Sequence, residues 1–233
     1  AIFLLQGTSN EELERLMGLG IETFVVDNEP DIDTLLEFMK NRQNLKDEAI
    51  KLFLRVKLKE NTLRTERHFV FGMDCEIINK RLAELSKNKN IKELGLHFHR
   101  KTQNLSEWNL RYEFENMIDE DVLRFIKVVN IGGGLPSVYK DTNVDVIELI
   151  LKRIKEFRDY LNKQGIKLMI EPGRFIAAPS GRLVSYIKSI YENNIIVNAS
   201  VYNSDMDAIL VPTKLLVEGE LEKGEGRPYV VKG

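Results

Sequence analysis

The sequence contains little of what several classes of protein depend on. Cys75 is its only cysteine, so no internal disulfide can form and a reducing, cytoplasmic location is expected. No uninterrupted apolar run approaches the roughly 20 residues that a membrane span needs. The first residues, AIFLLQGTSNEE, carry no basic segment, so no signal peptide is expected. A net charge of -2 gives no general attraction to nucleic acid or to an acidic membrane, and neither is expected as a partner.

Histidine is scarce as well, with only His68, His97 and His99 in the chain. The last two follow a short apolar run and are two residues apart, so their side chains could face the same side of a strand and share a metal ion. Metal-dependent amidohydrolases have such a pair, but their chemistry needs at least two more histidines on later strands. His68 precedes the pair, and we therefore expect no metal site.

Short apolar runs and helical patterns alternate over the first three quarters of the chain. We expect strands at 2–5, 21–26, 52–56, 94–98, 128–131 and 168–171. We expect helices beginning at Ser9 and Pro30, spanning 75–87, beginning near Ser106, and spanning 145–164. Strict alternation predicts parallel strands with right-handed crossovers, which fits an open doubly wound sheet or a closed barrel. After residue 181 the segments LVSYI, NIIVNASVY and AILVP favour a separate β-rich region.

Polar residues follow the apolar runs closely, and in parallel α/β folds ligands bind at these carboxyl ends of the strands. These residues are Asp27, Arg55, His99, the glycines Gly132, Gly133 and Gly134, Glu171 and Arg174. Each one has an ordinary structural alternative. Asp27 could cap a helix, Arg55 could form a surface ion pair, His99 could be a satisfied core histidine, and the glycines could form a plain tight turn. The set is more informative than its members because all lie on one predicted rim.

The chemistry of this rim suits a phosphorylated heteroaromatic ligand. The N–H groups of a glycine triplet can bind a phosphate, and Arg174 could add a charge-assisted contact to the same group. Glu171 suits a protonatable ring nitrogen, and His99 could lie against a flat ring. The spacing of a dinucleotide-binding fingerprint is absent.

Three segments, GLHFHRKTQN, VVNIGGGLP and IEPGRF, resemble those of the pyridoxal-phosphate-dependent decarboxylases of basic amino acids. This family includes the ornithine, diaminopimelate, arginine and carboxynorspermidine decarboxylases. The resemblance spans roughly residues 1–210 and includes ETFVVDNEPDIDTL and LFLRVKL. It implies an α/β fold, a (β/α)8 TIM-like barrel of the alanine-racemase type, of which residues 1–180 would supply six of the eight strands. Residues 181–233 would begin a C-terminal β domain.

The resemblance also implies a role for each residue of the rim. Glu171 would hold the pyridine nitrogen of pyridoxal 5'-phosphate protonated and His99 would stack on the ring, so these two are the expected catalytic residues. Arg174, Gly132, Gly133 and Gly134 would bind the phosphate, with the hydroxyl of Thr102 near it. Asp27 and Arg55 would form a supporting polar network. Asp205 and Asp207 could meet the distal ammonium of a substrate, or could form a polar turn.

Two departures accompany the resemblance. Lys101 stands where the family usually has glycine, in the segment His99-Arg100-Lys101-Thr102. The family's cofactor lysine lies on a strand before the segment that matches Ile2–Leu5, and a Cys-x-x-Asp-type segment lies late in its β domain. We therefore expect this sequence to be an internal portion of a longer enzyme.

The expected function is pyridoxal-phosphate-dependent decarboxylation of a basic or diamino acid, in polyamine or lysine biosynthesis, by a cytoplasmic homodimer. A catalytically inactive barrel that binds or regulates a partner protein is the alternative, and a racemase is a weaker one.

Overall fold

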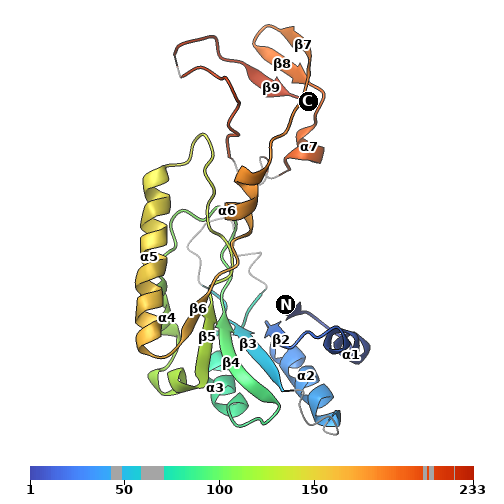
Figure 1. The fold of residues 1–233 in the computed structure, drawn as a ribbon, viewed down its shortest axis with the longest axis vertical. Helices are drawn as coiled ribbons and strands as arrows, with labels where there is room; N and C mark the ends of the chain where they lie inside the picture. The colour runs from blue at the N-terminus through green and yellow to red at the C-terminus, as the bar shows by residue number, and fades with distance from the viewer. Residues whose placement is uncertain (43–48, 59–70, 207–208, 210–212, 223) are drawn as a thin grey trace. The chain divides into compact units, whose positions relative to one another are not determined.

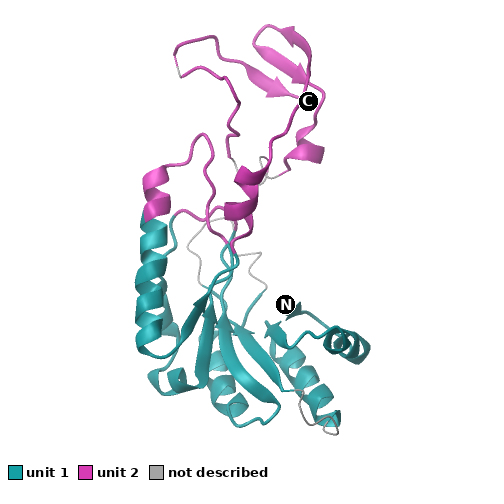
Figure 2. Ribbon diagram, viewed as in Figure 1, with its two compact units in different colours: residues 1–101, 106–133, 149–171 teal, residues 102–105, 134–148, 172–233 magenta. Residues whose placement is uncertain are grey.

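The computed structural model describes residues 1–42, 49–58, 71–206, 209, 213–222 and 224–233. The chain forms two compact units, which Figure 2 distinguishes by colour. Unit 1 consists of residues 1–101, 106–133 and 149–171, and unit 2 of residues 102–105, 134–148 and 172–233. The predicted domain boundary at residue 180 differs from this division and stays a prediction about the whole protein. Among the described residues, no helix combines the length and the apolar character that crossing a bilayer requires.

Unit 1 is built on a six-stranded parallel sheet in the order β1-β2-β3-β4-β5-β6 (Figure 1). The strands are β1 Ile2–Leu5, β2 Thr23–Val26, β3 Ile50–Arg55, β4 Ile91–His97, β5 Ile126–Asn130 and β6 Lys167–Met169. Each strand pairs with the next one in the sequence, and the order never reverses. A doubly wound sheet needs such a reversal, so the sequential order favours a barrel wall, which is not closed here.

Helices connect the strands in the predicted alternation. They are α1 Asn10–Gly18, α2 Glu29–Asn41, α3 Cys75–Leu85, α4 Leu110–Met117, the 3-10 helix η1 Glu120–Phe125 and α5 Val144–Lys163. The predicted capping box at the start of α1 is confirmed: the Ser9 side chain accepts from Glu12 N, and Glu12 Oε2 accepts from Ser9 N. Pro30 lies in the first turn of α2, as predicted.

The two faces of the sheet carry different side chains. One set of alternate residues, including Phe24, Leu52 and Leu54, is fully buried. The other set contributes a small cluster of Val25, Phe53 and Val128, with Met169 packed against it. Right-handed crossovers place the helices on a single face of a sheet whose strands follow in sequence order. The small cluster therefore lines the concave face, which is the interior of a barrel.

Unit 2 contains the elements that follow the sheet. They are α6 Gly173–Ala177, the 3-10 helix η2 Ala178–Ser180, β7 Ile187–Tyr191, β8 Asn194–Val197, α7 Val201–Ser204 and β9 Val230–Lys232. β7, β8 and β9 form a three-stranded sheet, as a β-rich region predicts.

Some boundaries in unit 2 differ from the prediction. NIIVNASVY is strand only over its first four residues, because the Ser200 side chain accepts from Tyr202 N and starts the short helix α7. Strand β7 begins where the predicted segment LVSYI ends. Most of the predicted strand AILVP lies outside the described residues.

Candidate cofactor site

A layer of polar side chains closes the concave face of the sheet at the carboxyl ends of its strands. Each member comes two residues after a side chain of the inner cluster or, on β4, after Gly95, so it points to the same side. The pairs are Val25 and Asp27, Phe53 and Arg55, Gly95 and His97, Val128 and Asn130, and Met169 and Glu171. The paired register continues this layer across the sheet, with Arg55 beside His97 and His97 beside Asn130.

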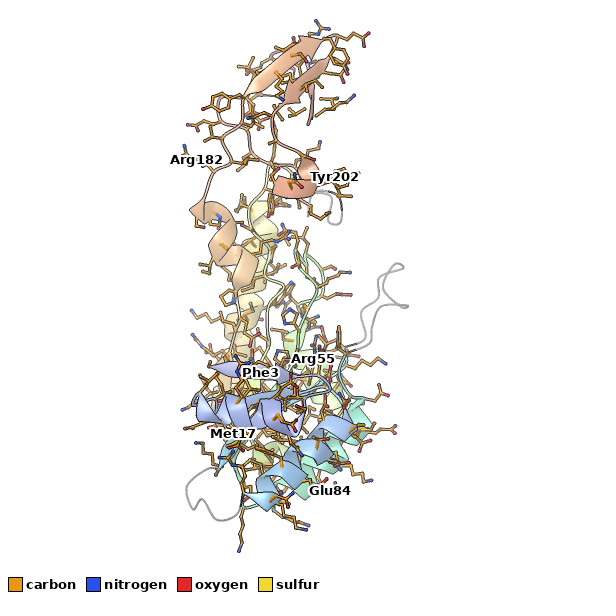
Figure 3. All side chains as sticks on the ribbon, turned by 90° about the vertical axis from the view of Figure 1, so that its right-hand side faces the viewer. Phe3, Met17, Arg55, Glu84, Arg182 and Tyr202 are labelled. Carbon is orange, nitrogen blue, oxygen red and sulfur yellow. The ribbon has the colours of Figure 1, made fainter. Side chains whose placement is uncertain are left out.

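A cavity of about 360 Å³ opens above this layer within unit 1. Three apolar side chains, Ile2, Leu4 and Val25, form one part of its wall. The other part is polar and consists of Arg55, His97, His99 and Glu171. Figure 3 labels Arg55, the last residue of β3. The cavity thus combines an apolar part of its wall with convergent charged and imidazole groups, as small-molecule sites do.

Glu171 is the best-supported anion of the cavity. Its Oε1 accepts a 2.8 Å hydrogen bond from Asn130 Nδ2, and its Oε2 lies 3.7 Å from His97 Nε2. The His97 and Asn130 side chains lower the pKa of Glu171 to about 2, against the effect of its partial burial, which raises it. Glu171 is therefore a carboxylate at neutral pH, which is the form that can stabilise a protonated ring nitrogen.

His97 and His99 differ in their surroundings. His97 is buried, and its Nδ1 has no hydrogen-bond partner among the described residues. His99 is exposed, so it is not the satisfied core histidine of the alternative interpretation. Although the residue is exposed, partial desolvation of its ring, together with nearby His97 and Arg55, lowers the pKa of His99, which favours the neutral imidazole. A neutral, accessible ring at the cavity suits stacking on a flat ligand.

Arg55 lines the cavity, and Asp27 is a buried member of the polar layer rather than a helix cap. The helix cap of α2 is Asn28, whose side chain accepts from Asp31 N, so Asp27 is not the capping residue. Asp27 is buried and accepts from Gln6 Nε2 and Asn28 Nδ2. Arg55 is partly buried; its burial lowers its pKa, while the charges of Asp27 and Glu171 act in the opposite direction. The supporting network that the family resemblance implies for these two residues stays a prediction.

The first glycine of the triplet has a geometric reason to be glycine. Gly132 has φ +62°, and a Cβ there would lie 2.3 Å from the backbone oxygen of Phe98. Its N–H donates to Asn130 Oδ1 at 2.9 Å, so it would have to exchange that partner to bind a phosphate. Gly133 has no such φ, and a Cβ there would lie 3.1 Å from Glu171 O and 3.3 Å from His99 Cε1. Gly133 therefore lies directly against His99 and Glu171, two residues that line the cavity.

Five predicted residues remain outside this description of the cavity. Gly134, Thr102, Arg174 and Asp205 belong to unit 2, so their roles at a cavity of unit 1 stay predictions. Asp207 lies outside the described residues.

Two residues of the layer were missed or set aside by the sequence prediction, namely His97 and Asn130. Asn130 was included only as part of the strand expected at 128–131, and His97 was considered only as a metal ligand. The two-residue spacing from inner-face positions would have found both.

The cavity could hold either of two kinds of group. The ligand atoms of His97, His99 and Glu171 lie within 4.8 Å of one another, so by spacing alone they could hold a metal ion. Pyridoxal phosphate fits more of the observed features: a carboxylate for the ring nitrogen, an exposed neutral imidazole for the ring face, and a glycine turn beside both.

Comparisons with known proteins support the interpretation that the cavity binds pyridoxal phosphate. Residues 1–178 match the family model described as the pyridoxal-binding domain of pyridoxal-dependent decarboxylases. The diaminopimelate decarboxylase of Aquifex aeolicus (strain VF5) is 27% identical over 161 residues, covering 62% of this chain and 38% of the relative. That of Buchnera aphidicola subsp. Baizongia pistaciae is 38% identical over 112 residues, covering 45% and 26%. The chain thus spans less than half the length of these curated relatives.

Solved structures share the fold at low sequence identity. Lysine/ornithine decarboxylase from Vibrio vulnificus, complexed with cadaverine, superimposes with a TM-score of 0.69 at 20% identity, covering 99% of this chain and 60% of that one. Diaminopimelate decarboxylase from Helicobacter pylori, complexed with L-lysine, gives 0.66 at 18% identity, covering 92% and 56%. The predicted barrel-type α/β fold is thereby confirmed. With the family model matching well over half of its residues, the chain belongs to the pyridoxal-dependent decarboxylase family.

Proposed function

We propose that the full-length protein is a pyridoxal-phosphate-dependent decarboxylase of a basic or diamino acid. The observation that carries this proposal is the ionised Glu171 in a cavity shared with His99 and Arg55, beside a glycine turn. The bound cofactor would supply an electron sink for the carbanion that remains when carbon dioxide leaves.

Each residue would then have one task. The Glu171 carboxylate would hold a proton on the ring nitrogen, His99 would cover one ring face, and Arg55 with Asp27 would set the charge of the wall. The N–H groups of the glycine triplet, Thr102 and Arg174 would hold the phosphate. Asp205 and Asp207 would meet the distal ammonium of the substrate.

Diaminopimelate is the substrate to test first, because the curated relatives described above are diaminopimelate decarboxylases. Lysine and ornithine come next, since the solved relative from Vibrio vulnificus is a lysine/ornithine decarboxylase. The first substrate would place the protein in lysine biosynthesis, and ornithine would place it in polyamine biosynthesis. A cytoplasmic homodimer is proposed from the family resemblance, and sedimentation of the purified protein would test the dimer.

The test is carbon dioxide release by the full-length protein with pyridoxal phosphate. The panel is diaminopimelate, lysine, ornithine, arginine and carboxynorspermidine, and Glu171→Gln is the control. We expect the visible absorbance of bound cofactor and release from one panel member, strongly reduced in the control. Cofactor binding without release from any member would favour the inactive barrel, and no cofactor binding would contradict the decarboxylase proposal.

A further inference from the structure

One buried side-chain amide connects Glu171, which lines the cavity, to the glycine turn. Asn130, the last residue of β5, is fully buried. Its Nδ2 donates to Glu171 Oε1 at 2.8 Å, and its Oδ1 accepts from Gly132 N at 2.9 Å. The side chain thus uses its donor on the ring-nitrogen side of the site and its acceptor on the glycine turn.

Backbone hydrogen bonds also join the glycine turn to the segment that carries Glu171. Glu171 N donates to Gly132 O at 2.8 Å, and Ile131 N donates to Met169 O at 3.0 Å. These bonds extend the pairing of β5 with β6 beyond the strand ends. The Gly132 peptide and the Glu171 carboxylate are therefore held in one hydrogen-bonded loop, with Asn130 at its centre.

The second carboxylate oxygen has a different partner. Glu171 Oε2 faces His97 Nε2 at 3.7 Å, and the buried His97 ring has no hydrogen-bond partner for Nδ1 among the described residues. With hydrogen on Nε2, the ring directs an N–H toward Glu171 Oε2 at a separation longer than an ordinary hydrogen bond. Each carboxylate oxygen is thus faced by its own buried side chain, which limits rotation of the Glu171 side chain.

We propose that Asn130 is a positioning residue for the cofactor, which holds the Glu171 carboxylate and the Gly132 turn in one fixed arrangement, with His97 as the second support of the carboxylate. This inference rests on the proposed function for its meaning in catalysis. The proposed arrangement involves only residues of unit 1, and testing it does not require a bound cofactor. Consistent with it, the partners of Glu171 are the groups that keep it ionised.

Asn130→Asp tests the two hydrogen bonds of the Asn130 side chain separately, because it keeps one and removes the other. An aspartate keeps the oxygen that accepts from Gly132 N, as residues at such turns do, but loses the donor and adds a negative charge near Glu171. We expect the pKa of Glu171 to rise above its value of about 2 in Asn130→Asp, because the bond that lowers it is lost. Asn130→Ser is a second variant, because its hydroxyl can still bond the turn and is too short to reach the carboxylate.

Asn79 offers a matched control. Its Nδ2 donates to Met117 O at 3.1 Å and its Oδ1 accepts from Asp119 N at 3.2 Å, so it also bridges a donor and an acceptor, both of them backbone groups. Asn79→Asp should leave the titration of Glu171 unchanged. His97→Phe should raise the pKa of Glu171, and His97→Gln, which keeps a donor, should raise it less.

The measurement is the titration of carboxyl carbons in the cofactor-free, full-length protein labelled with 13C glutamate. The Glu171 resonance is assigned as the one that disappears in Glu171→Gln. A raised pKa in Asn130→Asp and Asn130→Ser, with no change in Asn79→Asp, would support the inference. An unchanged pKa in the folded Asn130 variant, or the same rise in the control, would overturn it. Neither result depends on decarboxylase activity, so the proposed function can fail independently.

Discussion

His97 Nε2 lies 3.7 Å from Glu171 Oε2, although strand β5 separates β4 from β6 in the sheet. The approach is possible because His97 and Glu171 point to the concave face, where side chains from non-adjacent strands converge. The carboxylate that the family resemblance assigns to the cofactor is therefore held by two buried protein side chains. This pre-organisation has consequences that can be measured on the protein alone.

The stability supplied by the ionised Glu171 should depend on acid pH. The pKa of Glu171 is about 2 in the folded chain and near its ordinary 4.5 when unfolded, so folding favours the deprotonated form. This contribution is complete above about pH 5 and is lost as the pH falls toward 2. We expect the difference in free energy of unfolding between wild type and Glu171→Gln, from urea titrations without cofactor, to shrink steadily over that range. A difference that does not change with pH would show that Glu171 is not held ionised.

Glu171→Gln and Arg174→Ala should impair the loaded protein in different ways. A neutral amide cannot hold a proton on the ring nitrogen, so the first variant should lower kcat strongly and change the dissociation constant of pyridoxal phosphate little. The second should mainly raise that constant, by roughly 10- to 100-fold, because a charge-assisted bond typically contributes about 1.5–3 kcal/mol. Steady-state assays and cofactor titrations on both variants give the comparison. Identical profiles would contradict the separate roles.

Much of this site could be predicted from the sequence because its members follow apolar runs directly. Asp27, Arg55, His99, Gly132 and Glu171 carry that local signal, and the structure places them at strand ends. Asn130 has the spacing of an inner-face position, but its importance comes from a partner on the segment after β6. His97 was set aside because a histidine pair suggests a metal more readily than a carboxylate partner. The roles of both residues depend on contacts with a segment far away in the sequence, and a local sequence pattern does not contain such contacts.

The order and type of the first elements could also be predicted, whereas unit 2 was predicted less well. The helix α5 buries Ile147, Ile150, Ile154, Phe157 and Leu161, as its 3.6-residue period requires. In contrast, Val201–Ser204 has β-branched and aromatic residues but begins with a serine cap, and the cap determines a short helix. Strand propensity depends on context, so a three-stranded sheet with few buried residues leaves such boundaries open.

Gly95→Ala should destabilise the fold by crowding the side chains on the concave face of the sheet. A Cβ at this position of β4 would lie 2.6 Å from the Phe53 ring and 2.9 Å from Val128 O. Overpacking of this kind typically costs about 1–3 kcal/mol. We expect a lower melting temperature for Gly95→Ala, and partial recovery when Phe53→Leu is added to make room for the methyl group. If the double variant is no more stable than the sum of its single changes predicts, the Phe53 ring does not occupy the space above Gly95.

Gly132 and Gly133 should respond differently to added side chains. At Gly132 the left-handed φ and the 2.3 Å approach to Phe98 O leave no room for a Cβ, so Gly132→Ala should reduce the free energy of unfolding by at least about 1–3 kcal/mol. At Gly133 the backbone φ allows a side chain, but its Cβ would lie 3.1 Å from Glu171 O and 3.3 Å from His99 Cε1. Gly133→Val should therefore crowd the ring-binding side and weaken pyridoxal phosphate binding.

The two effects are separated by measuring each variant in two ways. Thermal melts without cofactor report stability, because bound ligand would itself shift the melting temperature. Cofactor titrations on the folded fraction report affinity. We expect Gly132→Ala to lower the melting temperature, and Gly133→Val to lose affinity with a near-normal melt. Normal affinity with a lowered melt for Gly133→Val would mean that the triplet is only a tight turn. In that case the phosphate must be held by other groups, of which Arg174 is the first to test.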